Sequence, residues 1–252
     1  DISSWDVSNV EIMHEMFYKA HSFNHPIASL PNRRNLSKVR NFYGFLRDAN
    51  SFNHPVDWGG VDGTRSAITM WGMFRSTSLN SPITLYTDKV NNMQTMFEGA
   101  EIFNSPLNFS NTENVARMSW MFKNAEKFNQ PLNFDTKSVV NMKQMFTNAA
   151  EFNQNINNWN VSKVQAFESM FTSAIAFNQQ IIPLDGNIER LLKRILNLKT
   201  EKEIKKENLH KEKKVFGQTS RSNDYVQALM EIGALLCKPK NPNCEKCPIT
   251  KN

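Results

Sequence analysis

Residues 115–129 read VARMSWMFKNAEKFN, and the same pattern, Val-x2-Met-x2-Met-Phe-x2-Ala-x2-Phe-Asn, recurs seven times between the amino terminus and about Gln179. Its Met-Phe step is marked by seven aromatic residues, which are Phe17, Phe45, Phe74, Phe97, Phe122, Phe146 and Phe171. The spacings between them are 28, 29, 23, 25, 24 and 25 residues. A period of about 20–29 residues is typical of leucine-rich-type repeats, so the sequence predicts a stack of similar units.

Each unit is expected to combine a short helix with a short strand. Met13, Phe17 and the apolar residues around them step by three or four positions, which places them on one stripe of a helix. After Phe-Asn, a proline turn precedes a short apolar piece, such as residues 132–134 or 156–159, which is a strand candidate. Because such a unit cannot bury its apolar face alone, neighbouring units must share one core. The predicted fold class is a right-handed α/β repeat solenoid, leucine-rich-repeat-like, over residues 1–178.

The Met and Phe positions of the pattern are the expected core. Methionine packs well in irregular interiors, and methionines at helical spacing beside phenylalanine favour a core over a soft-metal site. Asparagine after each Phe favours turn closure over a row of ligand-binding side chains. The expected core residues are Met13, Phe17, Phe23, Met96, Phe97, Phe103, Met121, Phe122, Phe128, Met145, Phe146, Phe152, Met170, Phe171 and Phe177.

The repeat pattern resembles that of a known family. The run WDVSNV at residues 5–10, together with the Met-Phe and Phe-Asn-x-Pro steps, is similar to the BspA-like leucine-rich repeats of bacterial and protist surface proteins. The resemblance covers about 180 residues. It implies an extracellular or cell-surface array that serves adhesion or protein binding and performs no catalysis. The second and third units are stretched, and Phe45-Leu46 stands where Met-Phe is expected.

The positive charge of the chain is confined to its carboxy-terminal part. Residues 1–180 hold 15 Lys+Arg against 15 Asp+Glu, whereas residues 181–252 hold 15 against 9, which accounts for the net charge of +6. DNA or another anionic partner is therefore expected only for that part. No run of about 18 consecutive apolar residues is present, so no membrane span is expected.

From about Ile182 the repeat pattern is lost. Apolar residues between positions 188 and 196 have the spacing of an amphipathic helix, and its polar face carries three candidate DNA-binding residues, Arg190, Lys193 and Arg194. Asp185 precedes this helix, and on local structure alone it is a helix N-cap.

All three cysteines lie near the carboxy terminus, at Cys237, Cys244 and Cys247. Their Cys-x6-Cys-x2-Cys spacing favours a metal or iron-sulfur site over three separate thiols. Zinc and iron-sulfur clusters both take four ligands, and this chain supplies three cysteines.

The carboxy-terminal segments Pro183–Leu196 and Asn223–Ile249 resemble the adenine DNA glycosylases of the helix-hairpin-helix superfamily. The resemblance implies that Asp185 stands at the catalytic carboxylate. It also implies that the cysteines take the first three positions of a four-iron, four-sulfur site, whose fourth ligand would follow Asn252. Zinc is the alternative metal. The DNA-gripping hairpin, the catalytic Glu and the helices around the base pocket have no counterpart in this sequence, so no glycosylase activity is expected.

The expected organisation is therefore a repeat solenoid at residues 1–178 followed by an incomplete, all-α glycosylase-like part at residues 179–252 with a cysteine-rich loop. The repeat part is expected at the cell surface with an unknown protein or surface ligand, and the second part in the cytoplasm with DNA. Ala174–Gln179 fits both patterns, which suggests a fusion of two fragments, and the true amino terminus is expected upstream. Three functions remain open: a surface binding module, a functional adenine-removing repair enzyme, and a metal-cluster DNA-binding tail.

Overall fold

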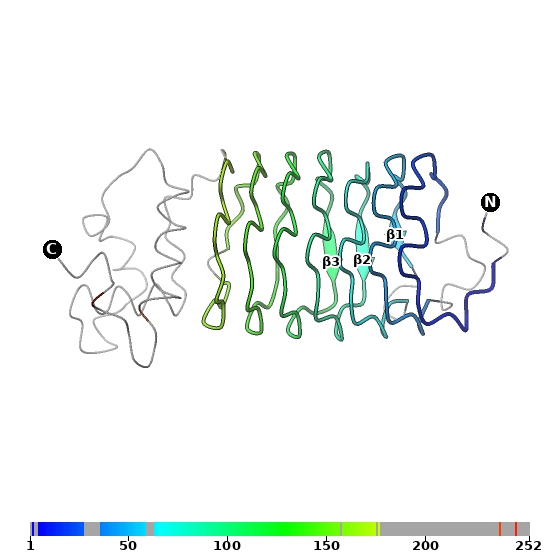
Figure 1. Cartoon of the computed structure of the whole chain (residues 1–252), viewed down its shortest axis with the longest axis horizontal. Helices are drawn as coiled ribbons and strands as arrows, with labels where there is room; N and C mark the ends of the chain where they lie inside the picture. The colour runs from blue at the N-terminus through cyan, green and yellow to red at the C-terminus, as the bar shows by residue number, and fades with distance from the viewer. Residues whose placement is uncertain are drawn as a thin grey trace.

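The computed structural model describes residues 2, 5–27, 36–58, 63–156, 158–174, 176, 237 and 245. Within the repeat region the chain forms successive coils that lie side by side along the long axis of the molecule (Figure 1). Three of these coils contribute a strand each: β1 (Val56–Asp57), β2 (Ile83–Leu85) and β3 (Leu107–Phe109). The strands form a parallel sheet in the order β1-β2-β3, with Ile83 paired to both Val56 and Leu107.

A second ladder joins all of the coils. Isolated parallel bridges connect one residue of each coil to the next, and these bridge residues are Ile12, Asn41, Thr69, Asn92, Arg117, Asn141 and Ala166. We number the coils 1 to 7 by these residues. Residues that lie the same number of positions after their bridge residues are equivalent, so the bridges define the alignment of the repeats.

The segments expected to be helical are turns, and the described residues contain no α-helix. In coil 1 the N–H groups of Met13 and Phe17 donate to the carbonyls of Asn41 and Phe45 in coil 2, each at 2.9 Å. A helix would direct these N–H groups to carbonyls four residues back in the chain. Positive φ angles, such as 54° at Glu15, also interrupt helical geometry. The helix prediction is therefore wrong here, because backbone donors reach the neighbouring coil instead.

The strand candidates at residues 132–134 and 156–159 are not strands in their described part; the strands lie in earlier coils. Their side chains nevertheless continue the packing of the sheet. The Phe134 ring stacks on Phe109 with centroids 5.8 Å apart and on Trp159 at 6.1 Å. Side-chain stacking thus continues in register after the backbone ladder at this position ends.

Phenylalanine columns run through the interior. Phe122 stacks on Phe97 at 5.4 Å and on Phe146 at 5.6 Å, with interplanar angles of 2° and 3°. A second column contains Phe128, whose centroid lies 4.1 Å from that of Phe122. From coil 3 to coil 7 the rings of the first column are stacked nearly parallel, and the buried residues of all coils form one apolar core.

Most of the expected core residues are buried. Those with at most 4% exposure are Met13, Met96, Phe97, Phe103, Met121, Phe122, Phe128, Met145, Phe146, Phe152, Met170 and Phe171. Phe17 and Phe23 are half-buried in coil 1. Phe177 lies outside the described residues.

The bridges correct the alignment of the second unit. In coils 1, 2 and 3 the fourth residue after the bridge residue is Met16, Phe45 and Met73, respectively. The fifth residue after it is Phe17, Leu46 and Phe74. Phe45 therefore takes the methionine position and Leu46 the phenylalanine position, one residue later than the sequence markers place it. Both are buried, since either order of a large and a medium apolar residue fills the same space.

Candidate functional site

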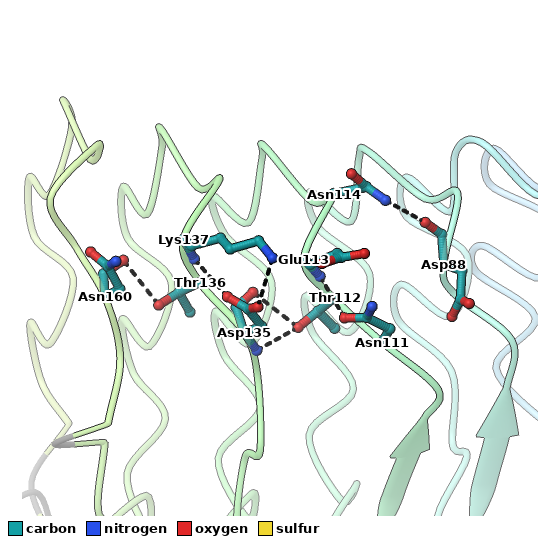
Figure 2. A network of polar contacts seen from close by, with 9 residues as sticks. All are labelled: Asp88, Asn111, Thr112, Glu113, Asn114, Asp135, Thr136, Lys137 and Asn160. Carbon is teal, nitrogen blue, oxygen red and sulfur yellow. Dashed lines mark hydrogen bonds and ion pairs between the residues drawn. The ribbon is translucent and has the colours of Figure 1, made fainter.

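A row of buried threonines links four coils to their neighbours at the corner where each turn segment begins. These are Thr64, Thr87, Thr112 and Thr136. The Thr112 hydroxyl donates to the carbonyl of Asp135 at 3.1 Å and accepts from the N–H of the same residue at 2.8 Å (Figure 2). Thr64 makes the same pair of bonds with Tyr86. The threonine hydroxyls thus take the place of backbone-to-backbone hydrogen bonds between coils. This threonine ladder stabilises the stack and is not a binding site.

The threonine ladder was not predicted from the sequence. Its signal was present, because a threonine stands three residues before the apolar residue that opens the turn segment in four consecutive units, as in Thr112 and Val115.

Replacing Thr112 by valine is expected to lower the free energy of unfolding by about 1–3 kcal/mol, since two inter-coil hydrogen bonds lose their shared partner. Valine fits sterically, because Val161 holds the equivalent position in coil 7. Chemical denaturation measures the loss. Thr112→Ser, which keeps the hydroxyl, is the control, and an equal loss in both variants would assign the effect to packing.

Charged side chains lie outside the threonine ladder and pair with one another. The Lys137 ammonium is 2.5 Å from a carboxylate oxygen of Glu113 and 3.4 Å from one of Asp135 (Figure 2). The hydrogen bond to Glu113 raises the pKa of Lys137, and Glu151 raises the pKa of Lys127 in the same way. Exposed pairs of this kind contribute little stability. This charged ridge therefore offers mutually paired groups rather than a reactive one.

Asparagines form another ladder after the second phenylalanine column. The side-chain oxygen of Asn104 accepts the backbone N–H of Asn129 at 2.9 Å, and Asn129 accepts that of Asn153 at 2.9 Å. The same bond joins Asn24 to Asn53 and Asn53 to Asn80. The expected asparagine ladder is present, but its side chains link neighbouring coils and do not close a turn within one coil.

The outer side of the turn segments varies from coil to coil. We call this surface the turn face and define it by the positions two, three and six residues beyond each bridge residue. Its residues are His14, Glu15, Tyr18, Tyr43, Gly44, Arg47, Trp71, Gly72, Arg75, Gln94, Thr95, Glu98, Ser119, Trp120, Lys123, Lys143, Gln144, Thr147, Glu168, Ser169 and Thr172. Five of them, Gly44, Gly72, Thr95, Ser119 and Thr147, are buried, and the others are half-buried or exposed. The positions between them, which point inward, repeat Met and Phe.

An aromatic cluster occupies the turn face of coils 1 to 3. Tyr43 and Trp71 stack with centroids 4.3 Å apart and an interplanar angle of 6°, and His14 meets Tyr43 edge-on at 4.6 Å. Tyr43 and Trp71 are half-buried and His14 is exposed. We define the aromatic cluster by these three residues. The sequence could not reveal it, because its members are 28 or more residues apart along the chain.

Arg47 fixes the edge of the aromatic cluster. Its guanidinium lies 3.9 Å from the Tyr18 ring centroid and 5.8 Å from that of Trp71. It also forms a 2.8 Å ion pair with Glu15. Hydrogen bonds with Lys19 and Arg47 lower the pKa of the Tyr18 phenol. The result is a surface that combines aromatic rings with charged groups.

Of the candidate residues in the carboxy-terminal part, the structure describes Cys237, which is buried. The others, which are Asp185, Arg190, Lys193, Arg194, Cys244 and Cys247, lie outside the described residues. Within the described residues no group of three or more His, Cys, Asp or Glu could hold a metal ion. Cys237 is therefore the one member of the predicted cysteine set that lies among the described residues.

Across the described part of the chain, no helix has both the length and the apolar character to cross a membrane.

Comparison with known proteins finds two kinds of similarity. A segment of 69 residues is 38% identical to an adenine DNA glycosylase of Buchnera aphidicola subsp. Schizaphis graminum and covers 26% of this chain and 20% of that protein. A segment of 70 residues is 37% identical to the adenine DNA glycosylase of Schizosaccharomyces pombe and covers 27% of this chain and 15% of that protein. The corresponding Arabidopsis thaliana protein is 33% identical over 69 residues, which are 27% of this chain and 11% of that protein.

The chain thus spans a fifth or less of the length of these curated relatives. The expected similarity to adenine DNA glycosylases is confirmed for this short segment. No solved structure matches the chain.

The repeat region matches a family model described as Mycoplasma protein of unknown function, DUF285. It matches three times, over residues 1–86, 61–134 and 108–189, and each match spans several coils. Together these matches cover residues 1–189 of 252. The chain therefore belongs to the DUF285 family.

Proposed function

We propose that residues 1–178 are a protein-binding module, a leucine-rich-repeat-type solenoid of the BspA-like kind, with the turn face as its binding surface. The observation that carries this proposal is the contrast between fixed inward and varied outward positions. Met and Phe recur inward in coil after coil, whereas His14, Tyr43, Trp71 and Gln94 follow one another at a single outward position. A surface whose side chains vary over a constant scaffold is suited to recognition.

The aromatic cluster is the proposed centre of this binding surface. Half-buried aromatic residues beside an arginine are the residue types enriched in the energetically dominant part of protein interfaces. Tyr43 and Trp71 are held by their mutual stacking and by Arg47, so little side-chain freedom is lost on binding. The charged ridge around Lys137 and Glu113 is less suited, since its groups already pair with each other.

The test compares two double variants with the parent protein in the capture of proteins from one cell extract. Tyr43→Gln with Trp71→Gln removes the aromatic cluster and is sterically tolerated, because Gln94 occupies the same position in coil 4. Glu113→Gln with Lys137→Gln alters the charged ridge and is the matched control. Proteins captured by the parent are expected to be lost from the first variant and retained by the second. Equal capture by all three proteins would contradict the proposal.

For residues 179–252 we propose a glycosylase-derived segment that has no activity of its own. Its derivation is supported by the 33–38% identity to adenine DNA glycosylases. An enzyme that excises a base must flip the nucleotide into a closed pocket, and repeat sequence stands before Asp185 where the resemblance implies the hairpin that grips DNA. Asp185 and the three cysteines enter no catalytic step in this proposal.

Incubation of the full chain with duplex DNA that carries adenine opposite oxidised guanine is expected to release no free adenine above background. Chromatography of the released base measures this. An active adenine DNA glycosylase under the same conditions is the control for the assay. Adenine release that disappears in an Asp185→Asn variant would overturn the proposal and favour the repair-enzyme alternative.

A further inference from the structure

The charged residues of the turn face pair across neighbouring coils. Each of its acids lies close to a base, with charged groups 2.8 Å apart in Glu15–Arg47, 3.3 Å apart in Arg75–Glu98 and 3.4 Å apart in Lys143–Glu168. The turn face holds one further base, Lys123 in coil 5. The charge of this lysine is therefore not balanced within the turn face.

Coil 5 carries two bases that form no ion pair with the described residues. Lys123 is half-buried, and the acid at the same position of coil 4, Glu98, pairs with Arg75 instead. Arg117, the bridge residue of coil 5, is exposed and borders the turn face. Trp120 stands between the two bases in the sequence, and its indole N–H is hydrogen-bonded to a side chain of coil 6 at 3.1 Å. Coil 5 thus offers two unpaired cations and a positioned aromatic ring.

Arg75 in coil 3 has unused hydrogen-bonding capacity. Its Nε lies 3.3 Å from a carboxylate oxygen of Glu98 and forms no hydrogen bond within the described part of the chain. A guanidinium carries five N–H donors, so this contact does not satisfy it, and the side chain is 37% exposed. We define the cationic patch by Arg75, Arg117 and Lys123.

The cationic patch lies within the stack and not at one of its ends. Coils 3 and 5 each have a described coil on either side, so the bases remain unpaired although the neighbouring coils are in place. Residues 1–180 hold 15 Lys+Arg and 15 Asp+Glu. The surplus of positive charge is therefore local to this surface and does not reflect the composition of the repeat region.

We propose that the cationic patch binds carboxylates of an acidic, extended segment of a protein partner. This inference rests on the proposed binding role of the turn face and specifies the chemistry of the partner. Arginine recognises a carboxylate through two parallel hydrogen bonds, and lysine recognises it as a point charge.

The repeat geometry sets the spacing of the partner's carboxylates. Arg75 and Lys123 hold the same position two coils apart, and neighbouring hydrogen-bonded segments lie about 4.8 Å apart. The two positions are therefore separated by about 10 Å along the stack. A polyproline II segment repeats its side-chain direction every three residues, or about 9.3 Å. Acidic residues three positions apart in such a segment would meet both bases.

Glu98 disfavours a nucleic acid at the same place. Its carboxylate stands between Arg75 and Lys123 in the row, where it would repel a continuous line of phosphates. A peptide can leave this position uncharged, because neutral residues separate its acidic side chains. The equal numbers of acids and bases in the repeat region also provide no long-range attraction for a polyanion.

The experiment measures the binding of the full chain to a labelled peptide of repeated Glu-Pro-Pro units by fluorescence anisotropy. Such a peptide holds its carboxylates at the required spacing in a polyproline II conformation. Saturable binding that weakens as salt is added is expected. One control peptide has glutamine in place of glutamate, and the other has the same residues with all glutamates in one block. Both are expected to bind at least about tenfold more weakly.

A matched pair of double variants locates the binding. Arg117→Asn with Lys123→Thr removes two bases of the cationic patch and fits sterically, because asparagine and threonine hold the equivalent positions in coil 6. Lys89→Asn with Lys163→Asn removes the same charge from two exposed lysines outside the turn face. Peptide affinity is expected to fall at least about tenfold in the first variant and to stay unchanged in the second. Both variants are expected to melt at the temperature of the parent.

Several outcomes would overturn this inference. Equal affinity of the parent and the first variant would assign the binding to the basic carboxy-terminal part, and equal binding of the block peptide would show that spacing does not matter. Tighter binding of single-stranded DNA of equal charge, lost in the first variant, would assign the cationic patch to a nucleic acid.

The proposed function is tested separately, because Tyr43 and Trp71 lie outside the cationic patch. Loss of protein capture in their double variant, together with no binding of the acidic peptide by the parent, would leave the proposed function standing and overturn this inference alone.

Discussion

Phe122→Ala is expected to lower the free energy of unfolding of the repeat region by about 3–5 kcal/mol. The ring is 0% exposed and is stacked between Phe97 and Phe146. It also contacts Phe128 in the second column, with centroids 4.1 Å apart. Truncation removes the buried apolar surface and leaves a cavity that two rigid rings cannot close. Chemical denaturation followed by circular dichroism measures the loss.

Two controls separate the cavity from other effects of the substitution. Phe122→Leu is expected to cost less than half as much, since Leu46 fills the equivalent position in coil 2. Phe109→Ala removes a ring that stacks on Phe134 but is only half-buried, and it is also expected to cost less. A Phe122→Ala midpoint within error of the parent would show that the phenylalanine columns do not carry the stability of the stack.

The inward positions could be predicted from the sequence because their chemistry is nearly invariant from unit to unit. Met121, Phe122 and Phe128 have counterparts at a fixed offset in most coils, and a constant apolar residue at a fixed offset in a repeat is a core position. Burial in coil 1 is lower than expected at Phe17 and Phe23. Among the described residues coil 1 contacts a single neighbouring coil. The sequence pattern identifies a core position but not the number of coils that cover it.

The backbone conformation could not be predicted in the same way. Apolar residues at steps of three and four fit a helix, yet two consecutive turns bring Met13, Phe17 and Ala20 to the same inner side. Positive φ angles at Glu15 and Lys19 show that the segment consists of turns and is not a helix. Neither residue is glycine, and no sequence rule marks glutamate or lysine for this conformation.

The turn face depends on long-range contacts that local patterns do not contain. Tyr43 and Trp71 meet because the stretched second unit still places its bridge residue, Asn41, beside Thr69. Each aromatic residue taken alone is unremarkable in the sequence. The aromatic cluster therefore follows from the spatial alignment of the coils and not from any local sequence pattern.

Thr95→Pro is expected to lower the free energy of unfolding by about 4 kcal/mol or more, the sum of two costs. Thr95 has a φ angle of 55°, whereas proline fixes φ near about −65°. Its N–H donates to the carbonyl of Ser119 at 3.0 Å, and proline removes that donor. The remaining bonds between coils 4 and 5 would have to distort to accommodate the new angle. Thermal and chemical denaturation measure the loss.

Glycine and alanine at the same position test why proline fails. In a helix, alanine is more stable than glycine by about 1 kcal/mol, whereas at a positive φ glycine is favoured because it has no Cβ. Gly44 and Gly72 hold the equivalent position in coils 2 and 3, with φ angles of 56° and 58°. Thr95→Gly is therefore expected to melt at a higher temperature than Thr95→Ala. The reverse order would favour helical geometry at this position and would contradict the positive φ angle of Thr95.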